Sequence, residues 1–241
     1  MHGCADSNPQ PAAGGAAAWS VGIEFLRAVA ARDYAGASTL LDDASARDGI
    51  GEVNGALSDA GRALLDLVEF EPGTIDVLGV VAHLAERAVE LAGSTRVESA
   101  HLRALIVFLG SEGLPCAARS EVTSWSPLDR RDALVTLVVG LAAWAALQRG
   151  CDLAGLASSL RRPTAAAPAL GTFGLAWRGT NGAPLPLQGI VPPGYAPHVT
   201  FLGASRCTLR SVFARVAYLR DARPGTDAPR QRIDAFATNA R

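Results

Sequence analysis

Apolar positions are densest between His101 and Arg149, where the pattern predicts two long helices joined by a polar turn. The first part, HLRALIVFLGSEGLPCAARS, is apolar on nearly every side, so residues 101–116 are expected at the centre of a helical domain. The second part contains signals for both of its ends: Ser126 can cap the start of the helix, and Gly150 is expected to end it. A helix of about 23 residues is roughly 35 Å long, enough to cross a small domain. We expect the other segments to pack around this helical hairpin.

The segments before residue 54 differ in their periodicity. Residues 1–18 are rich in Ala, Gly and Pro and are predicted to be disordered. Apolar residues such as Val21 and Phe25 then recur at helical spacing, which predicts an amphipathic helix ending near Arg32. The stretch from 38 to 53 is acidic, with a single pair of leucines, and is predicted to be a loop.

Two further helices are predicted between residue 54 and the hairpin. The segment NGALSDAGRALLDLVEF places its alanines and leucines on one face, with Asn54 as a candidate cap. Thr74 follows a Glu-Pro-Gly turn and is expected to cap VLGVVAHLAERAVELAG, which forms either one long helix or two short ones with a break near Ala82. After the hairpin, CDLAGLASSL predicts a short helix that ends before Pro163.

The sequence changes character beyond Pro163. Proline and glycine recur, and short β-branched or aromatic runs appear around 173–177 and 198–202. One amphipathic helix is predicted at about 208–220. The fold class predicted for the chain is all-α. The predicted divisions are a disordered N-terminus over 1–18, a helical bundle over 19–162 and a partly irregular C-terminal extension over 163–241.

Charge and cysteine content narrow the possible functions. The net charge is −1, from 22 basic and 23 acidic residues, so nothing indicates a nucleic-acid partner. All the basic residues are arginine, which together with abundant Ala, Gly and Pro suggests a GC-rich coding sequence. The cysteines are widely spaced and form no C-x-x-C pair, which favours reduced thiols in a cytosol-like compartment. They are Cys4, Cys116, Cys151 and Cys207.

Neither targeting nor membrane-spanning segments are predicted. The N-terminus lacks a basic region followed by an apolar core, so a secretory signal is not expected. The longest apolar run, 133–147, is shorter than the ~20 residues that a spanning helix needs. Residues 133–147 are therefore predicted to be a buried helix.

The motifs of catalysis are also missing from the sequence. No glycine-rich phosphate loop, paired-carboxylate motif or metal-ligand spacing occurs, so we expect neither a metal nor a cofactor. Cys116 with His83 or His101 is the one possible pairing of a nucleophile with a base. A buried structural thiol is the preferred role for Cys116. The chain is therefore predicted not to be an enzyme.

Four short segments, in chain order from about 19 to 160, carry a family resemblance. They are EFL at 24–26, ALSDAG at 56–61, FLGSEGLPC at 108–116 and LAAW at 141–144. Each resembles part of a homology motif or helix of the Bcl-2 family of apoptosis regulators, in the family's order and at similar spacing.

The resemblance implies a Bcl-2-like helical bundle with a surface groove beside its central helix. Such a groove binds the amphipathic helix of a pro-apoptotic relative, so the expected partners are these helices and the expected role is pro-survival. The implied location is the cytoplasm, with possible association with the outer face of mitochondria; no transmembrane anchor is predicted, and the oligomeric state is left open. The implied groove residues are Leu67, Phe70, Arg87, Glu90, Leu91, His101, Leu102, Arg103, Ala104 and Val107.

The sequence departs from the family pattern at several positions. Arg62 stands where the family's third motif has Asp, which makes this helix a poor killer ligand and favours the pro-survival role. Aligning the first motif on its Phe and Cys leaves Arg103, the expected anchor for a ligand Asp, one residue early and about 100° round the helix. The second homology motif and an apolar C-terminal anchor are missing, and this erosion is typical of a viral homologue.

Two other functional hypotheses remain open. The chain could be a helical scaffold that works through residues 163–241 and has no open groove. Alternatively, it could keep the Bcl-2-like fold while its second helix or its extension fills the groove and another surface acts.

Overall fold

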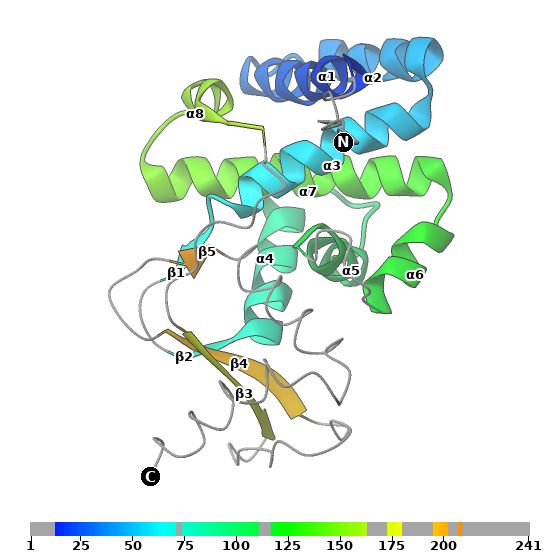
Figure 1. Ribbon diagram of the computed structural model, residues 1–241. Helices are drawn as coiled ribbons and strands as arrows, with labels where there is room; N and C mark the ends of the chain where they lie inside the picture. Colours follow the sequence, from blue (N-terminus) through cyan, green and yellow to red (C-terminus); the bar gives the residue numbers. More distant parts are fainter. Residues whose placement is uncertain are drawn as a thin grey trace, which may run out of the picture.

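Helix α7 (Pro127–Arg149) runs through the middle of the helical bundle (Figure 1). Its predicted limits are confirmed: the hydroxyl of Ser126 accepts a hydrogen bond from the Asp129 N–H at 3.1 Å, and Gly150 ends the helix in the left-handed conformation at φ 60°. Pro127 occupies the first turn, where its missing N–H costs nothing. Leu134, Leu137 and Val138 are fully buried. Helices α3 and α4 pack along α7 on either side.

The computed structural model describes residues 13–70, 74–110, 117–162, 173–179, 195–201 and 207–208. The helices are α1 (Ala13–Ala30), α2 (Tyr34–Asp48), α3 (Ile50–Leu65), α4 (Val77–Ala92), α5 (Ser99–Gly110), α6 (Ala117–Ser124), α7 and α8 (Leu153–Ser159). The short strands are β1 (Glu69–Phe70), β2 (Thr74–Asp76), β3 (Phe173–Gly179), β4 (Tyr195–Phe201) and β5 (Cys207–Thr208). The bundle is all-helical and therefore all-α, as predicted. Its Bcl-2-like arrangement stays a prediction.

The N-terminal helices differ from the sequence prediction in two ways. Helix α1 begins at Ala13, inside the segment predicted to be disordered. It ends at Ala30, close to the predicted end near Arg32, which has a positive φ of 59°. The prediction of a loop from 38 was wrong, because α2 runs from Tyr34 to Asp48. The Asp33 carboxylate caps α2 by accepting from the Gly36 N–H at 2.8 Å.

Helix α3 begins earlier than predicted, and α4 is one helix where the sequence allowed one or two. Helix α3 begins before Asn54, so Asn54 is not a cap but an interior residue, whose amide donates to the carbonyl of Pro127 at 3.0 Å. Helix α4 is continuous through Ala82, which settles the choice between one helix and two. Thr74 lies in β2 and does not begin a helix.

The predicted hairpin is interrupted by a third helix. Helix α6 lies between α5 and α7 in the chain, and residues 111–116 lie outside the described residues. Helix α5 is not buried on every side, because His101 and Arg103 are exposed. The central position predicted for 101–116 belongs to α7 instead. The buried side of α5 carries Leu102, Ala104, Leu105, Ile106, Leu109 and Gly110.

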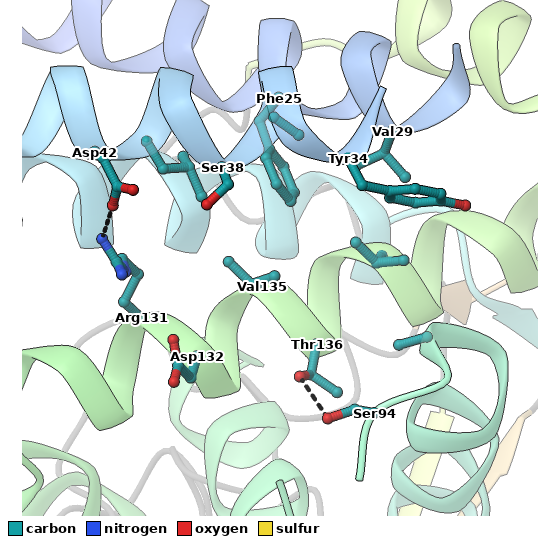
Figure 2. Close-up of a pocket in the computed structure, with 14 residues that line it drawn as sticks. Phe25, Val29, Tyr34, Ser38, Asp42, Ser94, Arg131, Asp132, Val135 and Thr136 are labelled. Carbon is teal, nitrogen blue, oxygen red and sulfur yellow. Dashed lines mark hydrogen bonds and ion pairs between the residues drawn. The ribbon is translucent and has the colours of Figure 1, made fainter. Parts of the chain in front are cut away.

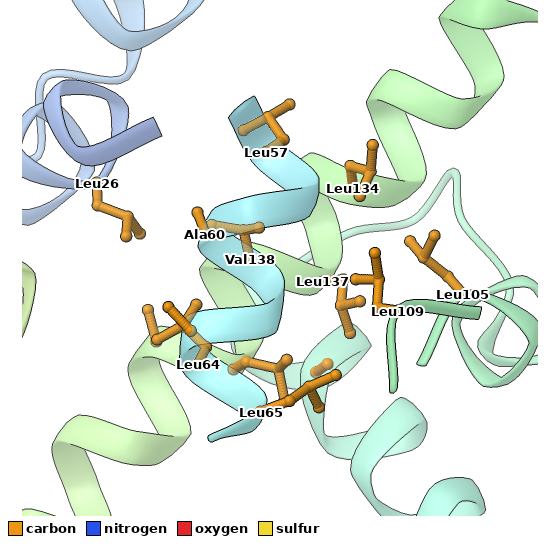
Figure 3. Close-up of a cluster of buried hydrophobic side chains, with 14 of the residues drawn as sticks. Leu26, Leu57, Ala60, Leu64, Leu65, Leu105, Leu109, Leu134, Leu137 and Val138 are labelled. Atoms are coloured by element: carbon orange, nitrogen blue, oxygen red, sulfur yellow. The ribbon is translucent and has the colours of Figure 1, made fainter. Parts of the chain in front are cut away.

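The core lies where α3 and α5 meet α7, with α1 closing the opposite side of α3 (Figure 3). Leu64 of α3, Leu109 of α5 and Leu137 of α7 are all fully buried. Glycines allow the helices to cross closely: a Cβ built on Gly61 would lie 2.9 Å from Cδ1 of Leu109. A Cβ built on Gly140 would meet the backbone of Ala88 in α4 even more closely.

A small antiparallel sheet stands beside the bundle, and its strand β2 leads directly into α4 (Figure 1). Its order is β2-β4-β3, with Ile75 opposite Val199 and Leu175 opposite Val199 on the other side. Strands β1 and β5 form a separate antiparallel pair. Strands β3 and β4 coincide with the two β-branched or aromatic runs noted in the extension. The predicted helix at about 208–220 overlaps β5 at Thr208, and the rest of it lies outside the described residues.

Candidate functional site

An ion pair between α4 and α5 lies among the predicted groove residues. The guanidinium of Arg103 on α5 donates to the Glu86 carboxylate on α4 at 2.9 Å. The two side chains are 46% and 59% exposed, so both are accessible to a partner. Val107 follows Arg103 by one turn on the same side of α5 and is half-buried. We call the surface formed by Glu86, Arg103 and Val107 the α4–α5 face.

The predicted residues of α4 are divided between two sides of that helix. Arg87 and Glu90 form an ion pair one turn apart, and Glu90 lies on the same side as Glu86. Leu91 is half-buried and lies about 140° round the helix from Glu86. Glu90 can therefore extend the α4–α5 face, whereas Leu91 belongs to a different side of α4.

Other predicted groove residues lie in the core or away from α5. Leu102 is fully buried, and Ala104 is 9% exposed, so neither presents a side chain to a partner. Leu67 is half-buried in the turn after α3. Phe70 is in β1, and its side chain lies outside the described residues. Of the predicted set, the structure brings Arg103, Val107 and Glu90 to one surface.

The two histidines considered for catalysis each contact a tryptophan. His101 lies edge-on to Trp125, with 5.3 Å between ring centroids, and His83 lies edge-on to Trp144 at the same separation. Cys116, their expected nucleophile, lies outside the described residues. Within the described ranges, no group of three or more His, Cys, Asp or Glu side chains is arranged to hold a metal ion.

The helix that resembles the family's third motif is built into the core. Leu57 is fully buried, and Gly61 packs directly against Leu109 of α5. Arg62, the charge-reversed position, pairs with Asp59 on its own helix at 2.9 Å. Asp59 also lies 3.9 Å from Arg162 after α8. Helix α3 is therefore held by contacts on several sides.

A hollow of about 340 Å³ separates α2 from α7 (Figure 2). Sequence reasoning missed it because α2 was predicted to be a loop. The signal was available: Ala37, Leu41 and Ala44 recur at helical spacing after the capping residue Asp33. The hollow is lined by Phe25, Val29, Tyr34, Ala37, Ser38, Leu41, Asp42, Ala92, Ser94, Arg131, Asp132, Val135, Thr136 and Val139.

Helix α7 is long and apolar enough to cross a membrane by length and composition alone. Its 18-residue apolar window is 56% buried inside the bundle, and it packs against α3 and α4. A buried core helix satisfies the same criteria, and the packing of α7 favours that assignment. Among the described helices, no other meets the criteria.

The described part of the chain is therefore an all-α bundle with a small sheet beside it, and the bundle has two accessible features, the α4–α5 face and the α2–α7 hollow. No protein-family model, curated protein or solved structure matches the chain. Function is consequently inferred from the geometry and charge of these two features and from the motif resemblance.

Proposed function

We propose that this chain binds an amphipathic helix of a partner protein on the α4–α5 face, as a Bcl-2-like pro-survival protein binds its death-promoting relatives. The observation that carries the proposal is Arg103, which is half-exposed one turn before the half-buried Val107. A cation beside an accessible apolar side chain suits a helix that presents an acidic residue next to its apolar stripe. The guanidinium can donate two parallel hydrogen bonds to a carboxylate.

The packing of α3 supports a receptor role over a ligand role. A death-promoting ligand must release the helix that carries the Leu-x-x-x-Gly motif, here Leu57 to Gly61. Release of α3 would expose Leu57, Leu64 and Leu65, all fully buried. Exposing each such side chain costs about 1.5–3 kcal/mol. Keeping α3 in the bundle and binding a partner's helix elsewhere avoids this cost.

Glu86 is an internal competitor for the proposed ligand. Its carboxylate already occupies the guanidinium of Arg103, so an acidic ligand residue must displace it or share the cation. Exposed ion pairs of this kind contribute about 0.2–1 kcal/mol, which makes the exchange inexpensive. Glu86 therefore lowers the affinity for an acidic helix without preventing binding.

Calorimetry with a panel of amphipathic peptides tests the proposal. Arg103→Ala should weaken binding of an Asp-containing peptide by roughly two- to fivefold, the worth of an exposed ion pair. Glu86→Gln should strengthen it by a similar factor, because the competing charge is removed. Val107→Asp should weaken it by about tenfold or more, because a carboxylate replaces an apolar contact. Arg47→Ala is the matched control, since Arg47 is also an exposed arginine paired with a neighbouring carboxylate, that of Asp48.

A second set of peptides tests whether the two charge variants act through the peptide's carboxylate. Replacing the peptide Asp by Ala should abolish the effects of both Arg103→Ala and Glu86→Gln, because these substitutions act through that carboxylate. Equal affinity of wild-type and Val107→Asp protein for every peptide would exclude the α4–α5 face. Failure of every peptide in the panel to bind would count against the helix-binding function itself.

The scaffold hypothesis is kept as a second candidate because the C-terminal extension pairs with the bundle. Strand β4 of the extension adds to β2, which leads directly into α4. A partner bound by the extension could therefore act on α4. Loss of partner binding on truncation after Arg162, with no effect of Val107→Asp, would favour this candidate over the first.

A further inference from the structure

The α2–α7 hollow is closed at one end by an ion pair. Arg131 of α7 donates to the Asp42 carboxylate of α2 at 2.8 Å, and the pair spans the space between the two helices (Figure 2). Tyr34, at the start of α2, lies at the other end of the row of labelled side chains. A long helix lying in the hollow would collide with the bridge between Asp42 and Arg131. The shape therefore favours a compact ligand.

The inner surface of the hollow is apolar. Phe25 and Val29 of α1 are buried beneath it, and Val135 of α7 is half-buried and borders it directly. Tyr34, at the edge of the hollow, is 65% exposed. A volume of about 340 Å³ lies within the range of about 300–1,000 Å³ typical of small-molecule sites. An apolar group of that size would cover Val135 and Tyr34, which are now partly exposed to water.

The charges around the hollow favour a cation. Asp42 and Asp132 contribute two negative charges and Arg131 one positive charge, so the lining carries a net charge of −1. Arg131 is already engaged by Asp42, whereas exposed Asp132 has no ion-pair partner among the described residues.

We propose that the α2–α7 hollow binds a small organic cation with an apolar body. The apolar body lies against Phe25 and Val135, and the ammonium group faces Asp132. This binding site shares no residue with the α4–α5 face and does not depend on the function proposed for it.

Nuclear magnetic resonance titrations of the full chain with three matched compounds test the proposal. 4-Phenylbutylammonium, 4-phenylbutanol and 4-phenylbutyrate share one apolar body and differ in charge. We expect chemical-shift changes in α2 and α7, with affinity in the order cation, alcohol, anion. The cation should bind roughly three- to fivefold more tightly than the alcohol, the ratio expected of one partly exposed charge pair.

Variants distinguish the hollow from general attraction to an acidic surface. Asp132→Asn keeps the size of the side chain and should remove the preference for the cation over the alcohol. Asp43→Asn is the matched control, because exposed Asp43 is on α2 but does not line the hollow, and it should keep the preference. Val135→Phe should weaken all three compounds by filling the space, and Arg103→Ala should change none of the affinities.

Three results would overturn the proposal. The first is equal affinity for the ammonium and the carboxylate compounds. The second is the same loss of preference in Asp43→Asn as in Asp132→Asn, which would mean that surface charge alone attracts the cation. The third is the lack of any chemical-shift change in α2 or α7 with all three compounds.

Discussion

Replacing Gly140 with alanine perturbs the closest helix crossing described in the bundle. Gly140 lies in α7 opposite Ala88 of α4, and a Cβ at this position would be 2.7 Å from the carbonyl carbon of Ala88 and nearer still to its Cα and oxygen. These are backbone atoms, so no side-chain rotation can relieve the overlap. The two helices must move apart, and the buried contacts around the crossing must loosen with them.

The expected magnitude is the difference between two opposing effects. Forcing an extra methyl group into a packed core costs about 1–3 kcal/mol, and contact with backbone places Gly140→Ala near 3 kcal/mol. Alanine is favoured over glycine inside a helix by about 1 kcal/mol. The net loss in free energy of unfolding should therefore be about 2 kcal/mol. In a chain of 241 residues this corresponds to a decrease in Tm of about 4–8 °C.

Urea and thermal unfolding followed by circular dichroism measure this loss. Gly55→Ala is the matched control, because Gly55 is an exposed residue inside α3 with no atom within 4 Å of a built Cβ. It should raise the free energy of unfolding by up to about 1 kcal/mol through helix propensity alone. If Gly140→Ala stabilised the protein as much as Gly55→Ala does, α4 and α7 could not cross at Gly140, and the arrangement around α7 would be wrong.

Two further stability predictions concern the start of α7. Ser126→Ala should lower the free energy of unfolding by about 1 kcal/mol, because the Asp129 N–H loses its hydrogen-bond acceptor, and Ser126→Asp should keep most of the wild-type stability. If urea unfolding gave wild type and both variants the same stability, Ser126 would not act as a helix cap. Asn54→Ala should cost about 1–2 kcal/mol by the same measurement, because the buried amide no longer donates to the Pro127 carbonyl. An unchanged unfolding midpoint for Asn54→Ala would show that this hydrogen bond does not hold α3 against α7.

The features of the fold that were predicted correctly are those set by nearby residues. Ser126 and Gly150 bound α7 because a cap and a left-handed glycine act within a few residues of the helix end. Helix α2 was missed because its apolar stripe is narrow and its acidic residues dominate the segment. The start of α3 was misjudged at Asn54, whose buried position depends on a hydrogen bond to Pro127, 73 residues away in the chain.

The central helix could not be chosen from hydrophobicity alone. Both α5 and α7 are apolar, but burial depends on which neighbours cover each side. Helix α5 ends at Gly110 and keeps Arg103 at the surface, whereas α7 presents buried positions from Ala133 to Ala146. The greater length of α7 lets α3 and α4 pack on it together. Segment length was therefore the better predictor of the central element.

The predicted groove depended on how α4 and α5 are rotated relative to each other, which the sequence pattern of either helix alone does not determine. Arg103 and Leu91 can line one groove only if α4 turns Leu91 toward α5. The ion pair between Arg103 and Glu86 places a different side of α4 against α5. One-residue differences rotate a side chain by about 100°, so an approximate motif alignment cannot fix which residues meet. The functional assignment therefore depends on Arg103 and Val107, which share one side of α5.

Helix α4 contributes to both proposed binding sites, which raises the question of coupling between them. Glu86 belongs to the α4–α5 face, and Ala92 at the end of α4 lines the α2–α7 hollow. The two positions are about 9 Å apart along one continuous helix. Displacing the Glu86 side chain changes a surface charge pair and leaves the backbone contact between Ala88 and Gly140 in place. That contact fixes α4 on α7 between the two sites, so binding of a ligand at one site does not move α4 at the other. The effects of Glu86→Gln and Asp132→Asn on the binding free energies of the two ligands should therefore be additive in the double variant.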